Sequence, residues 1–304
     1  MKNLSNYILE AKNRNLDIDR KQPKSRFELE MLISSAFKRK QYDLNFIDTS
    51  KITDMSELFE GVKHNFDVSS WDVSNVKDMS KMFSRCYAFT GKGLENWDVS
   101  NVTNMMWMFS ACYKFTGKAV ENWDVSNVKD MSYMFYNCKN FDCNLSNWDV
   151  SNVKDMSYMF TYCFKFNCNL STWDVSNVTN MRYTFYKCNM FTGKGLENWD
   201  VSKVTDMRHM FRLCKNFDCD LSNWNVSNVI DMYDMFAACE NFKGKGLENW
   251  DVSKVKDMNY MFNGCERLEC DLSSWNVNVT KAKATLNMFN GCDKMTIPNW
   301  YKIS

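Results

Sequence analysis

The thirteen cysteines are the residues of this 304-residue chain with the widest chemical scope, because thiolates bind soft metals, form disulfides and act as nucleophiles. A metal site needs clustered ligands such as C-x-x-C, but the closest spacing here is C-x-x-x-x-C and the chain has only 2 histidines. The cysteines share the apolar phase of the sequence, which predicts buried free thiols and no metal or cofactor. Disulfides between neighbouring repeats remain the alternative for an exported protein. The first column contains Cys86, Cys112, Cys138, Cys163, Cys188, Cys214, Cys239, Cys265 and Cys292, and the second contains Cys143, Cys168, Cys219 and Cys270.

Aspartates also recur at two positions, and stacked carboxylates could bind calcium. Repeats that bind calcium in this way have glycine-rich loops, which this sequence lacks, and Asn or Lys stands beside these carboxylates. Turn and helix-capping hydrogen bonds account for aspartate at such positions without an ion. We therefore expect both columns to be structural: Asp72, Asp98, Asp124, Asp149, Asp174, Asp200 and Asp251, and then Asp78, Asp130, Asp155, Asp206, Asp231 and Asp257.

Aromatic residues outside the apolar pattern are the strongest candidates for a binding function. They stand ten, and again thirteen or fourteen, residues after a recurring tryptophan, on what we predict to be one face of a short helix. Exposed clusters of Tyr and Trp mark contacts with protein partners, and the alternative is a second layer of packing. The predicted contact residues are Trp107, Tyr133, Tyr136, Tyr158, Tyr162, Tyr183 and Tyr186, and His209 continues the first row.

All of these residues belong to one internal repeat of 25 or 26 residues, marked by tryptophans from Trp71 to Trp300. In the repeat that begins at Trp148, apolar residues within 153–163 follow the period of a short helix, and residues 166–170 alternate like a strand. One helix and one strand in this length are typical of leucine-rich-repeat solenoids. The sequence therefore predicts an α/β solenoid of about ten coils over residues 47–304.

The repeated motif W-D-V-S-N-V-x-D-M-x-x-M-F-x-x-C-x-x-F resembles the BspA-type leucine-rich repeat, also described as the Mycoplasma-lipoprotein-type domain of unknown function. The similarity covers roughly residues 47–292 in tandem copies. It implies a solenoid of the kind found in bacterial surface proteins that bind host proteins or other cells, and it implies no catalytic residues. The chain differs from such surface proteins in showing no signal peptide, lipobox or wall anchor.

Residues 1–46 lie outside the repeat and contain two amphipathic segments, LSNYILEAKN and SRFELEMLISSAFKRK, that predict helices. Because a solenoid needs a cap over its open first coil, we expect residues 1–46 to form a helical N-terminal cap. The alternative is an addressing peptide, since the first segment resembles the amphipathic starts of internal head proteins in large tailed phages.

Charge and hydropathy exclude several functional classes. The chain has 38 Lys and Arg against 37 Asp and Glu, and a net charge of +1 argues against a nucleic-acid partner. No apolar run approaches the roughly 18 residues of a membrane-spanning helix. No phosphate-binding or catalytic motif indicates an enzyme.

These observations predict a non-enzymatic scaffold that binds a protein partner through its solenoid surface. The alternative is a structural, virion-associated phage protein with an N-terminal docking or addressing helix. We expect a monomer or weak oligomer that is cytoplasmic or virion-associated, and the family resemblance leaves the cell surface open.

Overall fold

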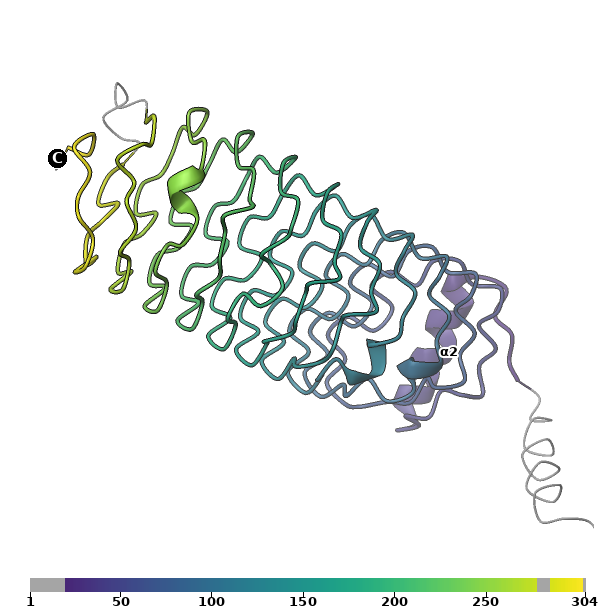
Figure 1. The fold of residues 1–304 in the computed structure, drawn as a ribbon. Helices are drawn as coiled ribbons and strands as arrows, with labels where there is room; N and C mark the ends of the chain where they lie inside the picture. The colour runs from purple at the N-terminus through teal and green to yellow at the C-terminus, as the bar shows by residue number, and fades with distance from the viewer. Residues whose placement is uncertain (1–19, 278–284, 303–304) are drawn as a thin grey trace, which may run out of the picture.

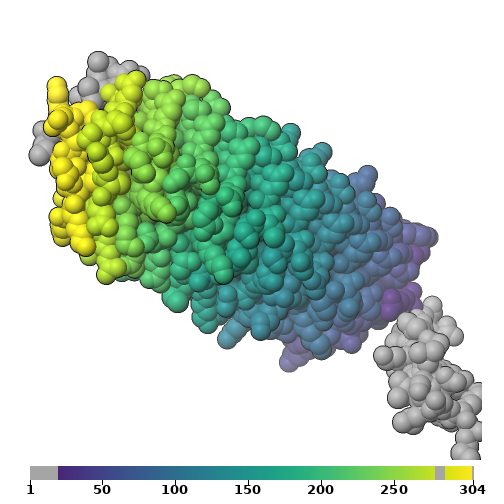
Figure 2. Space-filling view, in the orientation of Figure 1, coloured from purple at the N-terminus to yellow at the C-terminus, as the bar shows by residue number. Residues whose placement is uncertain are grey.

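The computed structural model describes residues 20–277 and 285–302. Within them the chain winds into flat coils that stack side by side into an elongated solenoid, from the purple N-terminal end to the yellow C-terminal end (Figure 1). The space-filling view shows the coils following one another in colour order along one continuous body (Figure 2). The regular elements of this region are one α-helix and three short 3-10 helices: α2 (Arg26–Lys38), η1 (Leu94–Asn96), η2 (Lys118–Val120) and η3 (Leu247–Asn249).

Helix α2 lies against the N-terminal end of the solenoid (Figure 1). Ser25 caps the helix by accepting a hydrogen bond from the backbone N–H of Glu28, and Leu29, Ile33 and Ala36 are buried in the same core as the coils. The helix predicted from SRFELEMLISSAFKRK is therefore present. The helix predicted from LSNYILEAKN lies outside the described residues, as do the addressing hypothesis and part of the divergent last coil.

The prediction of a short α-helix in each coil is wrong for the coils that the structure describes. Tyr158 and Tyr162 have left-handed backbones, with φ of 59° and 63°, and an α-helix cannot contain them. The N–H of Met159 closes a four-residue turn on the carbonyl of Met156 at 3.1 Å, whereas the N–H of Tyr158 donates to the carbonyl of Arg182 in the next coil at 2.9 Å. Successive turns of this kind repeat apolar residues about every three positions, which imitates the period of a helix in a stretch of ten residues.

The strand predicted at residues 166–170 does not form a continuous ladder. Phe166, Cys168 and Leu170 are buried and the two asparagines between them are exposed, so the alternation itself was predicted correctly. In the described residues, parallel pairing between coils appears as isolated bridges, such as Asp155 with Asn180. The main inter-coil hydrogen-bond ladder lies in the turn segment instead, because every second amide there is turned toward the next coil.

The core consists of columns of identical side chains. Phe160 is fully buried between Phe135 and Phe185, with ring centroids 5.8 and 5.6 Å away. Each repeat tryptophan from Trp71 to Trp300 donates its indole N–H to a carbonyl of the preceding coil, as Trp148 does to Val120 at 2.9 Å. Stacking and cross-coil hydrogen bonds therefore fix every coil on its neighbour.

Candidate functional site

The cysteine columns are structural. In the first column each thiol donates to the phenylalanine carbonyl of the preceding coil, as Cys163 does to Phe135 at 3.1 Å. All thirteen cysteines are free, and all except Cys270 are buried. Burial raises the pKa of Cys86 to about 12, so the thiol is protonated at neutral pH. In the part of the chain that the structure describes, no group of three His, Cys, Asp or Glu side chains could hold a metal ion.

We expect the native protein to react very slowly with a thiol reagent such as DTNB. At pH 8 a shift in thiol pKa from 9 to about 12 lowers the thiolate fraction about a thousandfold, and burial slows access further. The measurement compares the reaction in buffer with that in guanidinium, where all thiols should react at ordinary rates. Half-buried Cys270 should be the first to react in buffer. Fast native reaction of Cys163 would contradict its burial.

The aspartate columns form turns. Asp149 Oδ1 accepts from the backbone N–H of Ser151 at 3.0 Å, and hydrogen bonding by Ser151 lowers the pKa of the Asp149 carboxyl. In the second column Asp155 accepts from Ser157 at 2.7 Å and from the Asn180 amide of the next coil at 2.9 Å. The turn interpretation of these residues fits the observed bonds. Capping of coil helices does not, because the coils contain no α-helix in residues 47–277 and 285–302.

The structure brings the first row of predicted contact residues together as one stack, which we call the aromatic ladder. Trp107, Tyr133, Tyr158 and Tyr183 follow one another with ring centroids 3.9, 4.3 and 4.5 Å apart. His209 lies 4.1 Å beyond Tyr183. Each ring is half-buried and rises from a left-handed residue of the turn segment, not from a helix as predicted.

The second row packs against the ladder. Its members are Tyr136, Tyr162 and Tyr186, whose rings meet edge to face at 5.8 and 5.3 Å. Tyr186 also contacts Tyr183 of the ladder at 5.4 Å. The ladder rings cover one another's faces, so their edges and hydroxyls are what remains for a partner. Contact with a partner stays a prediction.

Sequence reasoning missed the charge of this surface. The segments nine to seventeen residues after the tryptophan, in the six coils that begin at Trp71 through Trp199, contain ten basic and no acidic residues. A net charge of +1 hides this asymmetry, which a count of charges position by position would have found. The basic residues are Lys81, Arg85, Lys114, Lys139, Lys165, Arg182, Lys187, Arg208, Arg212 and Lys215.

At each end of this surface a basic residue is paired with an acid, and basic residues in the middle lie on tyrosines. Lys81 pairs with Glu57 at 2.7 Å and Lys215 with Glu240 at 2.7 Å. In the middle, Lys139 lies 4.6 Å from the ring of Tyr113.

At the C-terminal end of the ladder a charged group replaces the aromatic residue. Asp234 occupies the ladder position of the next coil, its side chain is only 3% exposed, and it forms an ion pair with Arg212. His209 Nδ1 lies 3.2 Å from Asp234 Oδ2 without a well-directed hydrogen bond. Burial, and then the charge of Arg212, lowers the pKa of His209 to about 4, so this contact is not an ion pair at neutral pH.

We expect His209 to make folding stability depend on pH in mildly acidic solution. Its folded pKa of about 4 lies below the ordinary histidine value of 6.5, so the unfolded state binds a proton first and stability falls as pH decreases from 6.5 toward 4. The loss is at most about 1.4 kcal/mol per pH unit. His209→Tyr, which supplies the usual ladder residue, should flatten this slope in urea unfolding measured at several pH values.

A control is needed because burial also lowers the pKa of His64, the other histidine. His64→Phe should leave most of the slope in place, since desolvation is weaker there. An unchanged slope in His209→Tyr would show that folding does not lower the pKa of His209.

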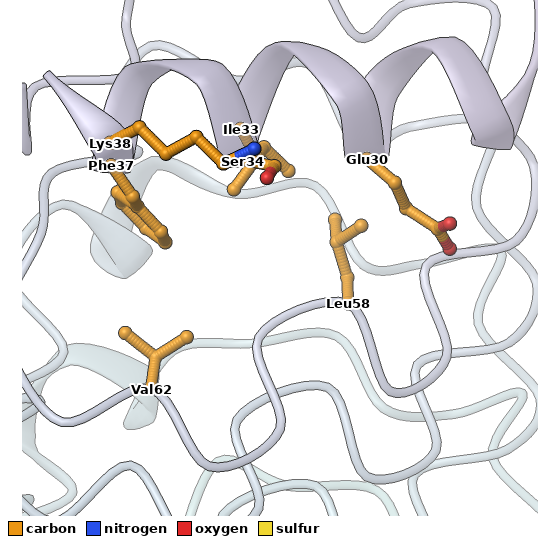
Figure 3. Close-up of a pocket in the computed structure, with 7 residues that line it drawn as sticks. All are labelled: Glu30, Ile33, Ser34, Phe37, Lys38, Leu58 and Val62. Atoms are coloured by element: carbon orange, nitrogen blue, oxygen red, sulfur yellow. The ribbon is translucent and has the colours of Figure 1, made fainter.

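A groove of about 460 Å³ lies between α2 and the first coil (Figure 3). Phe37 of α2 points toward Val62 of the coil, whereas Lys38 lies along the helix and Glu30 points away at the other end of the groove (Figure 3). The lining residues are Glu30, Ile33, Ser34, Phe37 and Lys38 from the helix and Leu58 and Val62 from the coil.

Comparisons with known proteins identify the family of the repeat. The model of DUF285, described as a Mycoplasma protein of unknown function, matches residues 28–120, 108–195 and 185–300. No curated protein sequence matches the chain. None of the helices in residues 20–277 and 285–302 is long and apolar enough to cross a membrane.

Solved structures show only distant likeness. A TLR13–ssRNA13 complex aligns with 82% of this chain and 42% of that chain, at 9% identity and a TM-score of 0.25. The functional domain of InlJ from Listeria monocytogenes, which includes a cysteine ladder, aligns with 82% of this chain and 62% of that chain, at 13% identity and a TM-score of 0.20. The chain thus spans less than two thirds of either structure.

The predicted resemblance to a Mycoplasma-type family of unknown function is confirmed at the level of the family, while the BspA-type name and the division of the chain at residue 46 stay predictions. The three family matches together extend from residue 28 to residue 300 and follow the repeat seen in the coils. The chain therefore belongs to the DUF285 family.

Proposed function

We propose that this protein is a non-enzymatic scaffold that binds a protein partner through the face formed by the aromatic ladder and the second tyrosine row. The supporting observation is the continuous stack from Trp107 to Tyr183, in which each ring is held by its neighbours but remains partly exposed. Tyr and Trp lose little side-chain entropy on binding and dominate interface hot spots. Rings that are already fixed by stacking lose still less side-chain entropy when a partner binds.

At the ladder position, ten residues after the repeat tryptophan, the backbone conformation is constant while the side chain varies. Such a surface could bind different partners when its side chains change and its backbone does not. Lys81, Trp107, Tyr133 and Asp234 all have φ between 55° and 60° there. A left-handed backbone conformation costs a residue other than glycine roughly 1 kcal/mol or more. Because such different side chains all adopt this conformation here, the stacking of the repeat must impose it. Surface residues can therefore be exchanged without changing the coil.

The non-enzymatic part of the proposal is supported by the state of the strongest nucleophiles. The buried thiols are protonated, as in Cys86 with its pKa of about 12. His209 is stacked on Tyr183 and adjoins a buried carboxylate, which leaves no nucleophile beside it in the described contacts.

The test is site-specific photo-cross-linking in cells that produce the protein. A benzophenone amino acid in place of Tyr158 should capture a discrete protein partner. The matched control places the same group at Lys194, an exposed residue outside the aromatic face. Capture at Tyr158 that unlabelled protein competes away, without capture at Lys194, would support the proposal. Equal capture at both positions, or none at Tyr158, would overturn it.

A further inference from the structure

We infer that the partner segment bound by this face is an acidic polypeptide. The inference rests on the proposed function and names the chemistry of the partner. It concerns the basic–aromatic face, defined as the aromatic ladder and the second tyrosine row together with Lys139, Arg182 and Lys187.

The three basic residues of this face are held by tyrosines and not by acids. Arg182 donates to the hydroxyl of Tyr158 from Nε at 3.1 Å and from Nη2 at 2.6 Å, and its guanidinium lies 5.2 Å from that ring. Lys187 Nζ lies 5.0 Å from the ring of Tyr162. Among the described residues, none of the ion pairs involves Lys139, Arg182 or Lys187.

Contact with a tyrosine ring positions a cation without neutralising it. The charge of these residues therefore remains available to an anion, whereas a salt bridge would have offset it. The tyrosine edges and hydroxyls around them supply hydrogen-bond donors that suit carboxylates. Cations that are held in place in this way lose little side-chain entropy when an acidic residue binds.

Acidic residues mark both ends of the face. At the N-terminal end Glu57 pairs with Lys81, and at the C-terminal end Asp234 and Glu240 pair with Arg212 and Lys215. These acids offset part of the positive charge at the two ends, so the middle coils hold the cations that lie on tyrosines. An acidic segment would be attracted there and repelled beyond it, which fixes where it binds along the solenoid.

The stacking of the ladder favours a polypeptide over a single-stranded nucleic acid. Nucleic-acid platforms need open ring faces on which bases stack. In the ladder the faces of Tyr133 and Tyr158 are covered by rings 3.9 to 4.5 Å away on both sides. What is left exposed, ring edges with hydroxyls beside cations, recognises carboxylate side chains and does not need a planar ligand.

The test measures fluorescence anisotropy of three labelled probes with the full chain. The probes are a twelve-residue peptide rich in Glu and Asp, the same peptide with Gln and Asn in those places, and a thymidine oligonucleotide of equal charge. We expect the acidic peptide to bind most tightly and to weaken with salt. Lys139→Gln, Arg182→Gln and Lys187→Gln together should weaken it about tenfold, equivalent to about 1.4 kcal/mol.

The matched control removes the same charge elsewhere, with Lys118→Gln, Lys154→Gln and Lys194→Gln at exposed positions outside the face. This variant should bind the acidic peptide like the parent within about twofold. Equal weakening by both triple variants, equal binding of the uncharged peptide, or tighter binding of the oligonucleotide would each overturn the inference. Thermal unfolding of both variants checks that each is folded.

Cross-linking separates this inference from the proposed function. If the partner captured through Tyr158 still binds the Lys139, Arg182 and Lys187 variant normally, the scaffold function stands and the acidic partner is wrong. If nothing is captured through Tyr158 while the acidic peptide binds with the expected dependence on the three cations, the charge inference stands and the cellular scaffold function fails.

Discussion

Phe160→Ala is expected to destabilise the protein by about 3–5 kcal/mol, the range for removing a fully buried phenylalanine. The ring has no exposed surface and lies 4.2 Å from Phe166 of its own coil. It also stacks on Phe135 and Phe185 of the two neighbouring coils. The substitution therefore opens a cavity at two coil interfaces at once.

Because each coil contacts mainly its two neighbours, this loss should uncouple the halves of the solenoid. Guanidinium unfolding should occur at lower denaturant and become less cooperative, and amide exchange should speed up around residues 135–185. Phe27→Ala is the control, since Phe27 is 69% exposed on α2 and should change stability by less than about 0.5 kcal/mol. Similar losses in both variants would contradict the central role of the phenylalanine column.

Gly117→Ala is expected to cost roughly 3 kcal/mol through backbone strain and overpacking together. Gly117 precedes η2 with φ of 92°, a conformation that side chains rarely adopt. An added Cβ would lie 2.5 Å from both Cys143 Sγ and Phe141 Cε2, which are buried in the next coil. Thermal or guanidinium unfolding measures the loss.

Gly61→Ala is the matched control because it separates strain from packing. Gly61 also has a positive φ, of 75°, but an added Cβ would meet nothing within 4 Å. Arg85 and Tyr162 occupy the equivalent position of other coils with φ of 60° and 63°, so the backbone accepts a side chain there. We expect a loss of about 1 kcal/mol. A loss in Gly117→Ala no larger than this would show that the next coil moves away freely.

The predicted contact residues form one surface because of the repeat length alone. Residues at the same position of successive coils must be neighbours when a regular repeat stacks, so Tyr133, Tyr158 and Tyr183 could be placed side by side from the sequence. The orientation of their rings could not. Whether faces point outward or cover one another depends on the left-handed backbone of the turn segment, which the pattern of Met, Phe and Cys does not reveal.

The sequence by itself determined the period of the repeat, the buried columns and the alternation at residues 166–170, whereas the structure decided that the cysteines are free. Only the tertiary structure decided that the apolar stretch at 153–163 forms turns and not a helix. Both conformations repeat apolar side chains every three or four residues. They differ in the acceptors of the backbone N–H groups, which lie four residues back in a helix and partly in the next coil here. Here every second backbone N–H donates to a carbonyl of the next coil, about 25 residues away. A short stretch of sequence does not include that acceptor, so its apolar pattern cannot distinguish the turns from a helix.

The cysteines, which have the widest chemical scope of any residues in the sequence, are thus part of the packing that holds the coils together. The surface proposed for binding combines stacked rings with the cations Arg182 and Lys187, which lie on tyrosine rings and form no ion pair with any residue that the structure describes. Net charge concealed it because acids at other positions of the repeat balance the total. The fold separated the two signs in space, since a solenoid turns each repeat position into its own strip of surface.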